Sequence, residues 1–133
     1  MNSTHRLLLA ASGGRVGWSF SGMPVLELTT TGRKSGQPRK SMLTSPYQEG
    51  ENMVIVASRG GDDHNPSWYL NLVAHPEVTV SVGGGPARQM RAEVVEPAER
   101  DRIWAVIAGK HRNYAGYQKK TSRTIPLVML HPV

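Results

Sequence analysis

The sequence contains no cysteine. This absence excludes disulfide bonds, thiolate nucleophiles and metal or iron–sulfur sites that depend on cysteine ligands. The five histidines are scattered along the chain without the spacing of metal ligands, so we expect no metal site. Any chemistry must therefore use oxygen and nitrogen groups or a bound cofactor.

A long hydrophobic run is also missing. The longest apolar stretch near the N-terminus, residues 7–11, is too short for the core of a signal peptide. It is also far shorter than the roughly 20 residues that span a bilayer. We therefore expect a cytoplasmic protein.

Acidic residues are in short supply. The chain has 16 Lys and Arg against 10 Asp and Glu, which gives a net charge of +6. Such an excess favours an anionic partner. Nucleic acid, an acidic membrane surface and a phosphorylated cofactor would satisfy it equally well.

Length and hydrophobic pattern predict a single domain over residues 24–133, behind an N-terminal arm or short helix at residues 1–23. Two to three helices are expected, one of them starting at Asn65–Pro66 with Asn65 as its cap and another at Pro97. Alternating apolar stretches predict about six strands. These strands are 25–31, 39–47, 53–58, 78–82, 90–94 and 125–130. The order favours a mainly β fold, either a small antiparallel barrel or a strongly curled sheet with peripheral helices.

The loop that follows the first of these strands is rich in cations, hydroxyls and glycine. Its cations are Arg33, Lys34, Arg39 and Lys40. Glycines allow backbone amides to turn toward an anion, cations neutralise it, and hydroxyls complete its hydrogen bonds. The loop suits a phosphate, although its spacing is not that of a Walker A loop. A solvated charged turn is the alternative.

Ser58 ends an apolar strand just before two glycines, where backbone and hydroxyl donors could meet a ligand ring. No Gly-x-Ser-x-Gly elbow surrounds it, so we do not expect a hydrolase nucleophile. A role as a turn or cap residue is the alternative.

Two tyrosines, Tyr114 and Tyr117, stand three residues apart in a polar segment and would share one face of a helix. A tyrosine in a cleft can donate a proton or a hydrogen bond to a developing anion. Packing explains such a pair equally well. In the expected short helix, Trp68 and Tyr69 taken alone indicate core packing, and Asn71 indicates a hydrogen bond from the helix to a loop.

Four blocks of sequence follow one another in order. They are LTTTGRKSGQPR at 28–39, ASxGG at 57–61, NPxWYLNLxAxP at 65–76 and YxxYQxxTxRTIP at 114–126. Together they resemble the deazaflavin-dependent nitroreductase family, the actinobacterial reductases that use coenzyme F420. The resemblance covers most of the chain from residue 28 onward.

This resemblance implies a split antiparallel β-barrel related to flavin-binding reductases. It also implies that the basic loop binds the phosphate and oligoglutamate tail of the cofactor. Tyr114, with Tyr117, falls at the family's substrate pocket, and Ser58 would polarise the ring or the substrate. The residues implied in cofactor binding are Arg33, Lys34, Ser35, Arg39, Lys40, Ser41, Met42, Leu43, Thr44, Val56, Ala57, Ser58, Arg59, Ser67, Trp68, Tyr69, Leu70 and Asn71.

The implied activity is hydride transfer from reduced F420 to an electron-poor acceptor such as a quinone, an activated alkene or a nitroaromatic. The sequence departs from nitroimidazole-reducing members by carrying His111 where they can carry a further tyrosine, so the pocket is expected to be altered. Because a quinone can reside in the membrane, a weak association with a membrane surface would give the protein access to it. The protein is expected to be a monomer or a homodimer. An FMN-dependent reductase, a non-catalytic cofactor carrier and a basic nucleic-acid-binding barrel are the alternatives, although no nucleic-acid partner is expected on the main interpretation.

Overall fold

The computed structural model describes residues 19–20, 23–61 and 63–133. Most of the expected N-terminal arm, residues 1–23, lies outside these residues. Eight strands are present in the described part of the chain. They are β1 (Ser19–Phe20), β2 (Met23–Thr31), β3 (Pro38–Thr44), β4 (Tyr47–Glu49), β5 (Asn52–Val56), β6 (Glu77–Val82), β7 (Arg88–Val94) and β8 (Leu127–Pro132).

All of these strands pair antiparallel and form one curled sheet in the order β1-β2-β6-β7-β8-β5-β4. Strand β3 pairs with β2 alone, with Thr31 opposite Pro38 and Val25 opposite Thr44. The mainly β, antiparallel barrel architecture predicted from the sequence is confirmed.

The central strands are buried on both faces, which gives the molecule two hydrophobic clusters. On β5, Met53 and Ile55 point into the curled sheet, where they pack with Leu26 and Leu28 of β2. The intervening Val54 points to the opposite face, into a second cluster that contains residues of two helices. The sheet therefore supports one layer inside its curl and another outside it.

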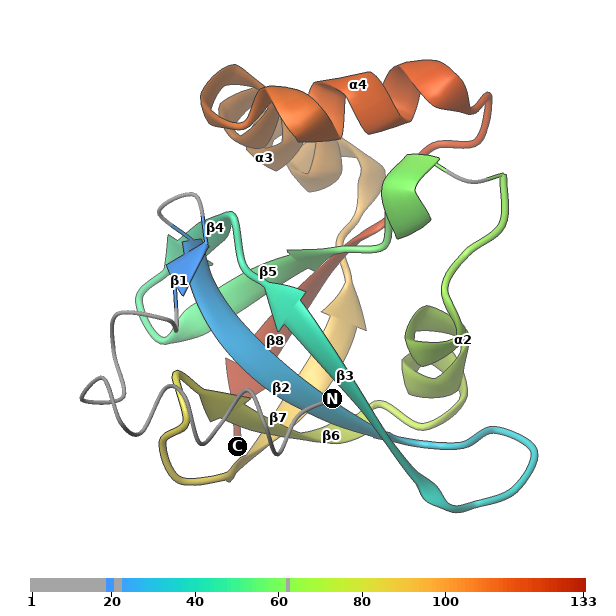
Figure 1. Ribbon diagram of the computed structural model, residues 1–133, viewed down its shortest axis with the longest axis vertical. Helices are drawn as coiled ribbons and strands as arrows, with labels where there is room; N and C mark the ends of the chain where they lie inside the picture. Colours follow the sequence, from blue (N-terminus) through green and yellow to red (C-terminus); the bar gives the residue numbers. More distant parts are fainter. Residues whose placement is uncertain (1–18, 21–22, 62) are drawn as a thin grey trace.

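Each cluster is covered by its own helices (Figure 1). Helix α2 (Ser67–Ala74) contributes Trp68 and Leu72 to the inner cluster. Helices α3 (Pro97–Lys110) and α4 (Arg112–Lys120) cover the outer cluster. A 3-10 turn, η2 (Arg59–Gly61), lies against α4. Helix α3 begins at the predicted Pro97, since proline fits the first helical position, where no N–H is needed.

Two local predictions were wrong. The expected strand 39–47 is divided at Ser45 and Pro46, because proline has no N–H for the ladder and the buried Ser45 hydroxyl donates to the Val54 carbonyl at 2.7 Å. This division and the short β1 raise the strand number above the six expected. Asn65 does not cap α2: Pro66 occupies the cap position, and the Asn65 side chain accepts a hydrogen bond from Arg123 at 2.8 Å.

Candidate active site

The loop between β2 and β3, residues 32–37, is closed by its own backbone. The Gly32 N–H donates to the Gln37 carbonyl at 2.8 Å, and the Gly36 N–H donates to the Gly32 carbonyl at 2.8 Å. Gly36 has a φ of 72°, a conformation that glycine adopts readily. A Cβ at Gly32 would lie 2.6 Å from the Ser35 hydroxyl oxygen. A side chain at Gly32, directly after β2, would therefore displace the Ser35 hydroxyl and crowd the Gln37 carbonyl at 3.2 Å.

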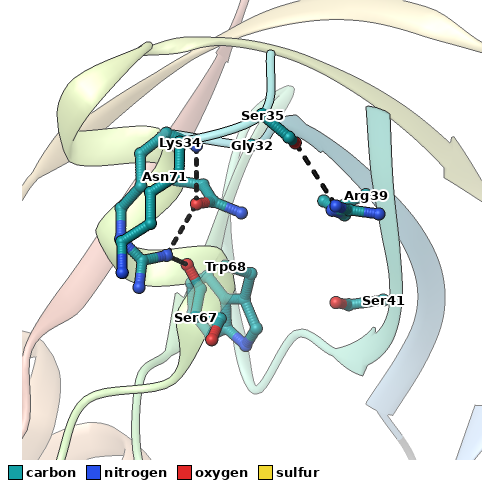
Figure 2. A pocket seen from close by; sticks show the side chains of 9 residues that line it. Gly32, Lys34, Ser35, Arg39, Ser41, Ser67, Trp68 and Asn71 are labelled. Carbon is teal, nitrogen blue, oxygen red and sulfur yellow. Dashed lines mark hydrogen bonds between the residues drawn. The ribbon is translucent and has the colours of Figure 1, made fainter. Parts of the chain in front are cut away.

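A cavity of about 360 Å³ lies between this loop, β3 and α2 (Figure 2). Its lining consists of Gly32, Arg33, Lys34, Ser35, Arg39, Ser41, Ser67, Trp68 and Asn71. All of these except Gly32 are residues that the sequence implied in cofactor binding. Gly32 was missed because its sequence signal, a glycine after a β-branched run, indicates only a turn. The fold brings the first and third sequence blocks together here.

Asn71 of α2 connects the basic loop to the helix. Its side-chain oxygen accepts hydrogen bonds from the Arg33 backbone N–H at 3.1 Å and from Arg33 Nη1 at 2.8 Å. Its amide nitrogen donates to the Thr30 hydroxyl at 3.3 Å, and that hydroxyl donates to the Arg39 carbonyl at 3.4 Å. Asn71 is 4% exposed. One buried amide thus links both ends of the loop to α2.

The charge around the cavity is positive and uncompensated. Arg33, Lys34 and Arg39 line it, and none of the described residues that line it is a carboxylate. None of these cations, nor Lys40, forms an ion pair with a residue that the structure describes. Arg39 Nη2 donates to the Ser35 hydroxyl oxygen at 3.3 Å, which holds one cation at the rim. Cations and hydroxyls around a glycine turn suit a phosphate or carboxylate group.

The other residues implied in cofactor binding do not line this cavity. On β3, Lys40 is exposed, whereas Met42, Leu43 and Thr44 are half-buried. On α2, Tyr69 is half-buried and Leu70 is 37% exposed. Val56, Ala57 and Ser58 are buried where β5 ends, and Arg59 after them is exposed with a φ of 47°.

Ser58 combines burial with unsatisfied donors. It is 8% exposed. Its carbonyl accepts hydrogen bonds from the Gly61 N–H at 2.9 Å and from Arg123 at 3.0 Å. Neither its hydroxyl nor its N–H has a hydrogen-bond partner among the described residues. Buried donors are normally paired, so a ligand or a water is the expected partner.

Tyr114 and Tyr117 of α4 meet edge to face, with ring centroids 5.8 Å apart and an interplanar angle of 90°. Tyr114 is 6% exposed. Its hydroxyl lies 3.1 Å from the Thr44 hydroxyl and 3.9 Å from the Met23 sulfur. The helix face predicted for the two tyrosines is therefore present, and it faces the outer hydrophobic cluster.

Burial raises the pKa of the Tyr114 phenol above its ordinary value. The hydrogen bond with Thr44 lowers the pKa by a smaller amount, and the neighbouring Tyr117 raises it. The phenol consequently stays protonated at neutral pH. Tyr114 can donate a hydrogen bond or a proton, and it cannot act as a resting tyrosinate.

A second cavity, of about 290 Å³, lies beside Tyr114. His111, which packs edge-on against the Tyr114 ring at 6.2 Å, lines it together with Lys110. Met23, Pro24 and Pro46 form its apolar wall. The described residues contain no group of three or more acidic, His or Cys side chains placed to hold a metal ion.

Comparison with known proteins shows the family to which the chain belongs. The family model described as F420H2-dependent quinone reductase matches residues 3–132. The chain belongs to this family. It is accordingly an oxidoreductase that uses coenzyme F420H2 as its cofactor and reduces a quinone.

Individual relatives agree with this assignment. The chain is 41% identical to an F420H2-dependent quinone reductase of Mycobacterium tuberculosis strain H37Rv, over 95% of this chain and 86% of the relative. A solved structure described as F420-H2 dependent reductase FDR-A is 38% identical and covers 81% of this chain and 94% of its own, with a TM-score of 0.71. Another, described as a domain-swapped dimer, is 34% identical over 97% and 94% of the two chains, with a TM-score of 0.73.

These comparisons confirm the resemblance inferred from the four sequence blocks and the cofactor it implied. No helix within the described residues is long and apolar enough to cross a membrane.

Proposed function

We propose that the cavity between the basic loop and α2 binds the anionic part of F420H2, its phosphate and oligoglutamate tail. The observation that carries this proposal is the convergence of Arg33, Lys34 and Arg39 on one cavity, whose lining among the described residues contains no carboxylate. The hydroxyls of Ser35 and Ser41 add hydrogen-bonding groups on the loop and β3. The residues present fit an anion with several oxygen atoms.

The ring of the cofactor is then placed toward Ser58. A strand rises about 3.3 Å per residue, so Ser41 at the cavity and Thr44 beside Tyr114 are about 10 Å apart along β3. A cofactor whose tail is fixed at the loop can therefore reach the region between the end of β5 and α4. The unpaired, buried donors of Ser58 support a ring acceptor atom there.

Bound F420H2 supplies a hydride from C5 of its deazaflavin, and the quinone needs that hydride and a proton to become a hydroquinone. We assign Tyr114 to the acceptor, with Tyr117 packed against it. When the Thr44 hydroxyl donates to the Tyr114 oxygen, the phenolic proton is directed away from Thr44. The thioether of Met23 is a weak acceptor, so this proton is available to a quinone oxygen on which negative charge develops.

Delivery of a lipid-soluble quinone would be helped by a weak contact with an acidic membrane surface. Leu70 and Val73 of α2 are 37% and 55% exposed, and the cations of the neighbouring loop would face the lipid headgroups. For assembly, a monomer and a homodimer are the proposed forms, and similarity to a domain-swapped dimer supports the second.

The test is anaerobic oxidation of F420H2 in the presence of a water-soluble quinone, an enone or a nitroaromatic compound. We expect the quinone to be reduced fastest, since His111 alters the pocket relative to nitroimidazole-reducing proteins. Titration with oxidised F420, FMN and random duplex DNA provides the binding control. Binding of DNA as tight as that of F420 would favour the nucleic-acid alternative, and retention of FMN alone would favour a flavin enzyme.

A further inference from the structure

The segment after α4 belongs to the fourth sequence block, but the proposed function gives it no task. Its central residue is Arg123, and the hydrogen bonds of its guanidinium include those to Ala57, Ser58 and Asn65. Nη2 donates to the Ala57 carbonyl at 3.1 Å and to the Ser58 carbonyl at 3.0 Å. Nη1 donates to the Asn65 side-chain oxygen at 2.8 Å. A single side chain therefore holds both ends of the loop that connects β5 to α2.

The same segment is fixed to α4. The Gln118 side chain donates to the Arg123 carbonyl at 2.7 Å, and the Thr121 hydroxyl accepts from the Arg123 N–H at 3.3 Å. That hydroxyl in turn donates to the Asp63 carboxylate at 2.6 Å. The turn η2 lies directly against α4, close enough that a Cβ on Gly61 would approach the Tyr117 carbonyl to 2.8 Å. Figure 1 shows η2, in green, beneath the C-terminal part of α4.

The bonds from Arg123 affect what Ser58 can offer to a ligand. The Ala57 carbonyl and the Ser58 N–H belong to one peptide group, so a cation on that oxygen polarises the N–H and makes it a stronger donor. The Ser58 carbonyl is occupied by Arg123 and Gly61. The Ser58 N–H and hydroxyl, which have no partner among the described residues, are the polar groups that remain available.

We propose that Arg123 is a positioning residue that holds the Ser58 donors toward the cofactor ring and fixes them relative to the tyrosines of α4. This inference rests on the proposed placement of the ring at Ser58. Arg123 acts through the 57–58 backbone and through the 121–123 segment, and it makes no contact with the reacting atoms. A guanidinium is required because only its planar fork reaches two carbonyls and an amide oxygen at once.

The test is a double-mutant cycle with affinity for oxidised F420, followed by the fluorescence of the cofactor, as the readout. We expect Ser58→Ala to weaken binding about tenfold in the otherwise unchanged protein, the scale of one hydrogen bond. In the Arg123→Met background the same substitution should weaken binding less than about threefold, because the loop no longer holds the Ser58 hydroxyl in place.

Arg100→Met is the matched control. Like the half-buried Arg123, the buried Arg100 donates to a backbone carbonyl, that of Ile125, at 2.9 Å. It also bonds to the Gln118 side chain, but it lies on the α3 side of the segment. In that background Ser58→Ala should keep its full tenfold effect. If Arg123→Met does not fold, Arg123→Lys replaces it: lysine keeps the charge without the fork and should reduce the Ser58→Ala effect by a smaller factor.

Two results would overturn the inference in distinguishable ways. If Ser58→Ala weakens binding equally in the parent and in the Arg123 variants, or if Arg100→Met reduces its effect as much, Arg123 has only a structural role. If Ser58→Ala leaves binding unchanged in the parent, the ring does not meet Ser58, and both the proposed placement and the inference fail. Thermal unfolding of each variant confirms that the compared proteins are folded.

Discussion

The two halves of the candidate site differ in how they are built. The basic loop is exposed, is made of residues adjacent in sequence and carries cations that form no ion pair within the described part of the chain. The tyrosine cluster on α4 is buried against the outer hydrophobic layer, and the Tyr114 hydroxyl meets residues 70 and 91 positions away. Binding an anion through charge tolerates solvent, whereas burial fixes the orientation of the Tyr114 phenol and raises its pKa further above neutrality.

The difference predicts that the two regions govern different steps. A residue that interacts only with charge developing on the acceptor should affect turnover, because its contribution is absent in the ground state. Residues that hold the cofactor's anionic tail should affect affinity in both states. Substitutions in the two regions can therefore test whether one region governs turnover and the other governs affinity.

The largest effect is expected for Tyr114→Phe, which removes the hydroxyl and keeps the ring. Turnover with a quinone should fall about tenfold to ten-thousandfold, the range for loss of a general acid together with its hydrogen bond. Affinity for F420 should stay near normal. The measurements are anaerobic oxidation of F420H2 and fluorescence titration with oxidised F420.

Tyr47→Phe provides the control, since its hydroxyl bonds to the exposed Glu49 at 3.0 Å and has no place in the site. It should leave turnover unchanged. Loss of stability in Tyr114→Phe without loss of turnover would make Tyr114 a packing residue. The proton would then have to come from elsewhere.

The next largest effect is expected for the double substitution Arg33→Ala and Lys34→Ala. Loss of two charge-assisted contacts should weaken F420 binding by about ten- to a thousandfold, with a larger loss for polyglutamylated forms and a weaker dependence on salt. Arg88→Ala with Arg91→Ala removes the same charge from β7, where both arginines form exposed ion pairs, and should change affinity less than about threefold. Equal losses in the two double variants would show that net charge, and not the loop, attracts the cofactor.

A smaller effect, on the free energy of unfolding, is expected when one glycine of each region is replaced by alanine. Gly36 in the basic loop and Gly61 beside α4 both have positive φ, 72° and 86°. A Cβ at Gly36 would meet no atom within 4 Å, whereas at Gly61 it would lie 2.8 Å from the Tyr117 carbonyl. Gly36→Ala should therefore cost about 1–2 kcal/mol of unfolding free energy from backbone strain, and Gly61→Ala about 2–5 kcal/mol because steric overlap adds to it. Urea unfolding measures the loss of stability in each variant. Equal losses would show that α4 moves away from the added methyl group at little cost.

The smallest effect is the pH dependence of stability that Tyr114 contributes. Its folded-state pKa is raised by burial, so the folded protein binds the phenolic proton more tightly than the unfolded chain, whose tyrosine pKa is about 10. Stability should be unaffected by Tyr114 below about pH 10 and should fall as the pH rises from there through the folded pKa. Urea unfolding between pH 8 and 11 should show a smaller decline for Tyr114→Phe than for the parent protein. An identical decline would mean that the phenol is ionised as easily in the folded state.

Sequence patterns anticipated most of the strands because alternation of apolar side chains is a local property. The same patterns failed at Ser45–Pro46, where a buried serine and a proline interrupt a β-favouring run, and at Asn65, a good helix cap that is taken by Arg123. At Asn65 a partner 58 positions away outweighed the local preference, whereas at Ser45–Pro46 the proline itself has no N–H for the ladder. The expected hydrogen bond from Asn71 to a loop is confirmed, but nothing local indicates that its amide connects both ends of the basic loop to α2.

The antiparallel β class and the cation-rich loop could be predicted from the sequence alone, because alternation, turn chemistry and charge act over a few neighbouring residues. The family and its cofactor followed from the resemblance of the four blocks. Only the tertiary structure decided that Tyr114 is buried against Thr44, that the Ser58 donors lack partners among the described residues, and that Arg123 spans the loop beside them. Burial and hydrogen-bond partners depend on contacts between residues as far as 91 positions apart, and such contacts exist only once the sheet has curled and the helices have packed on it.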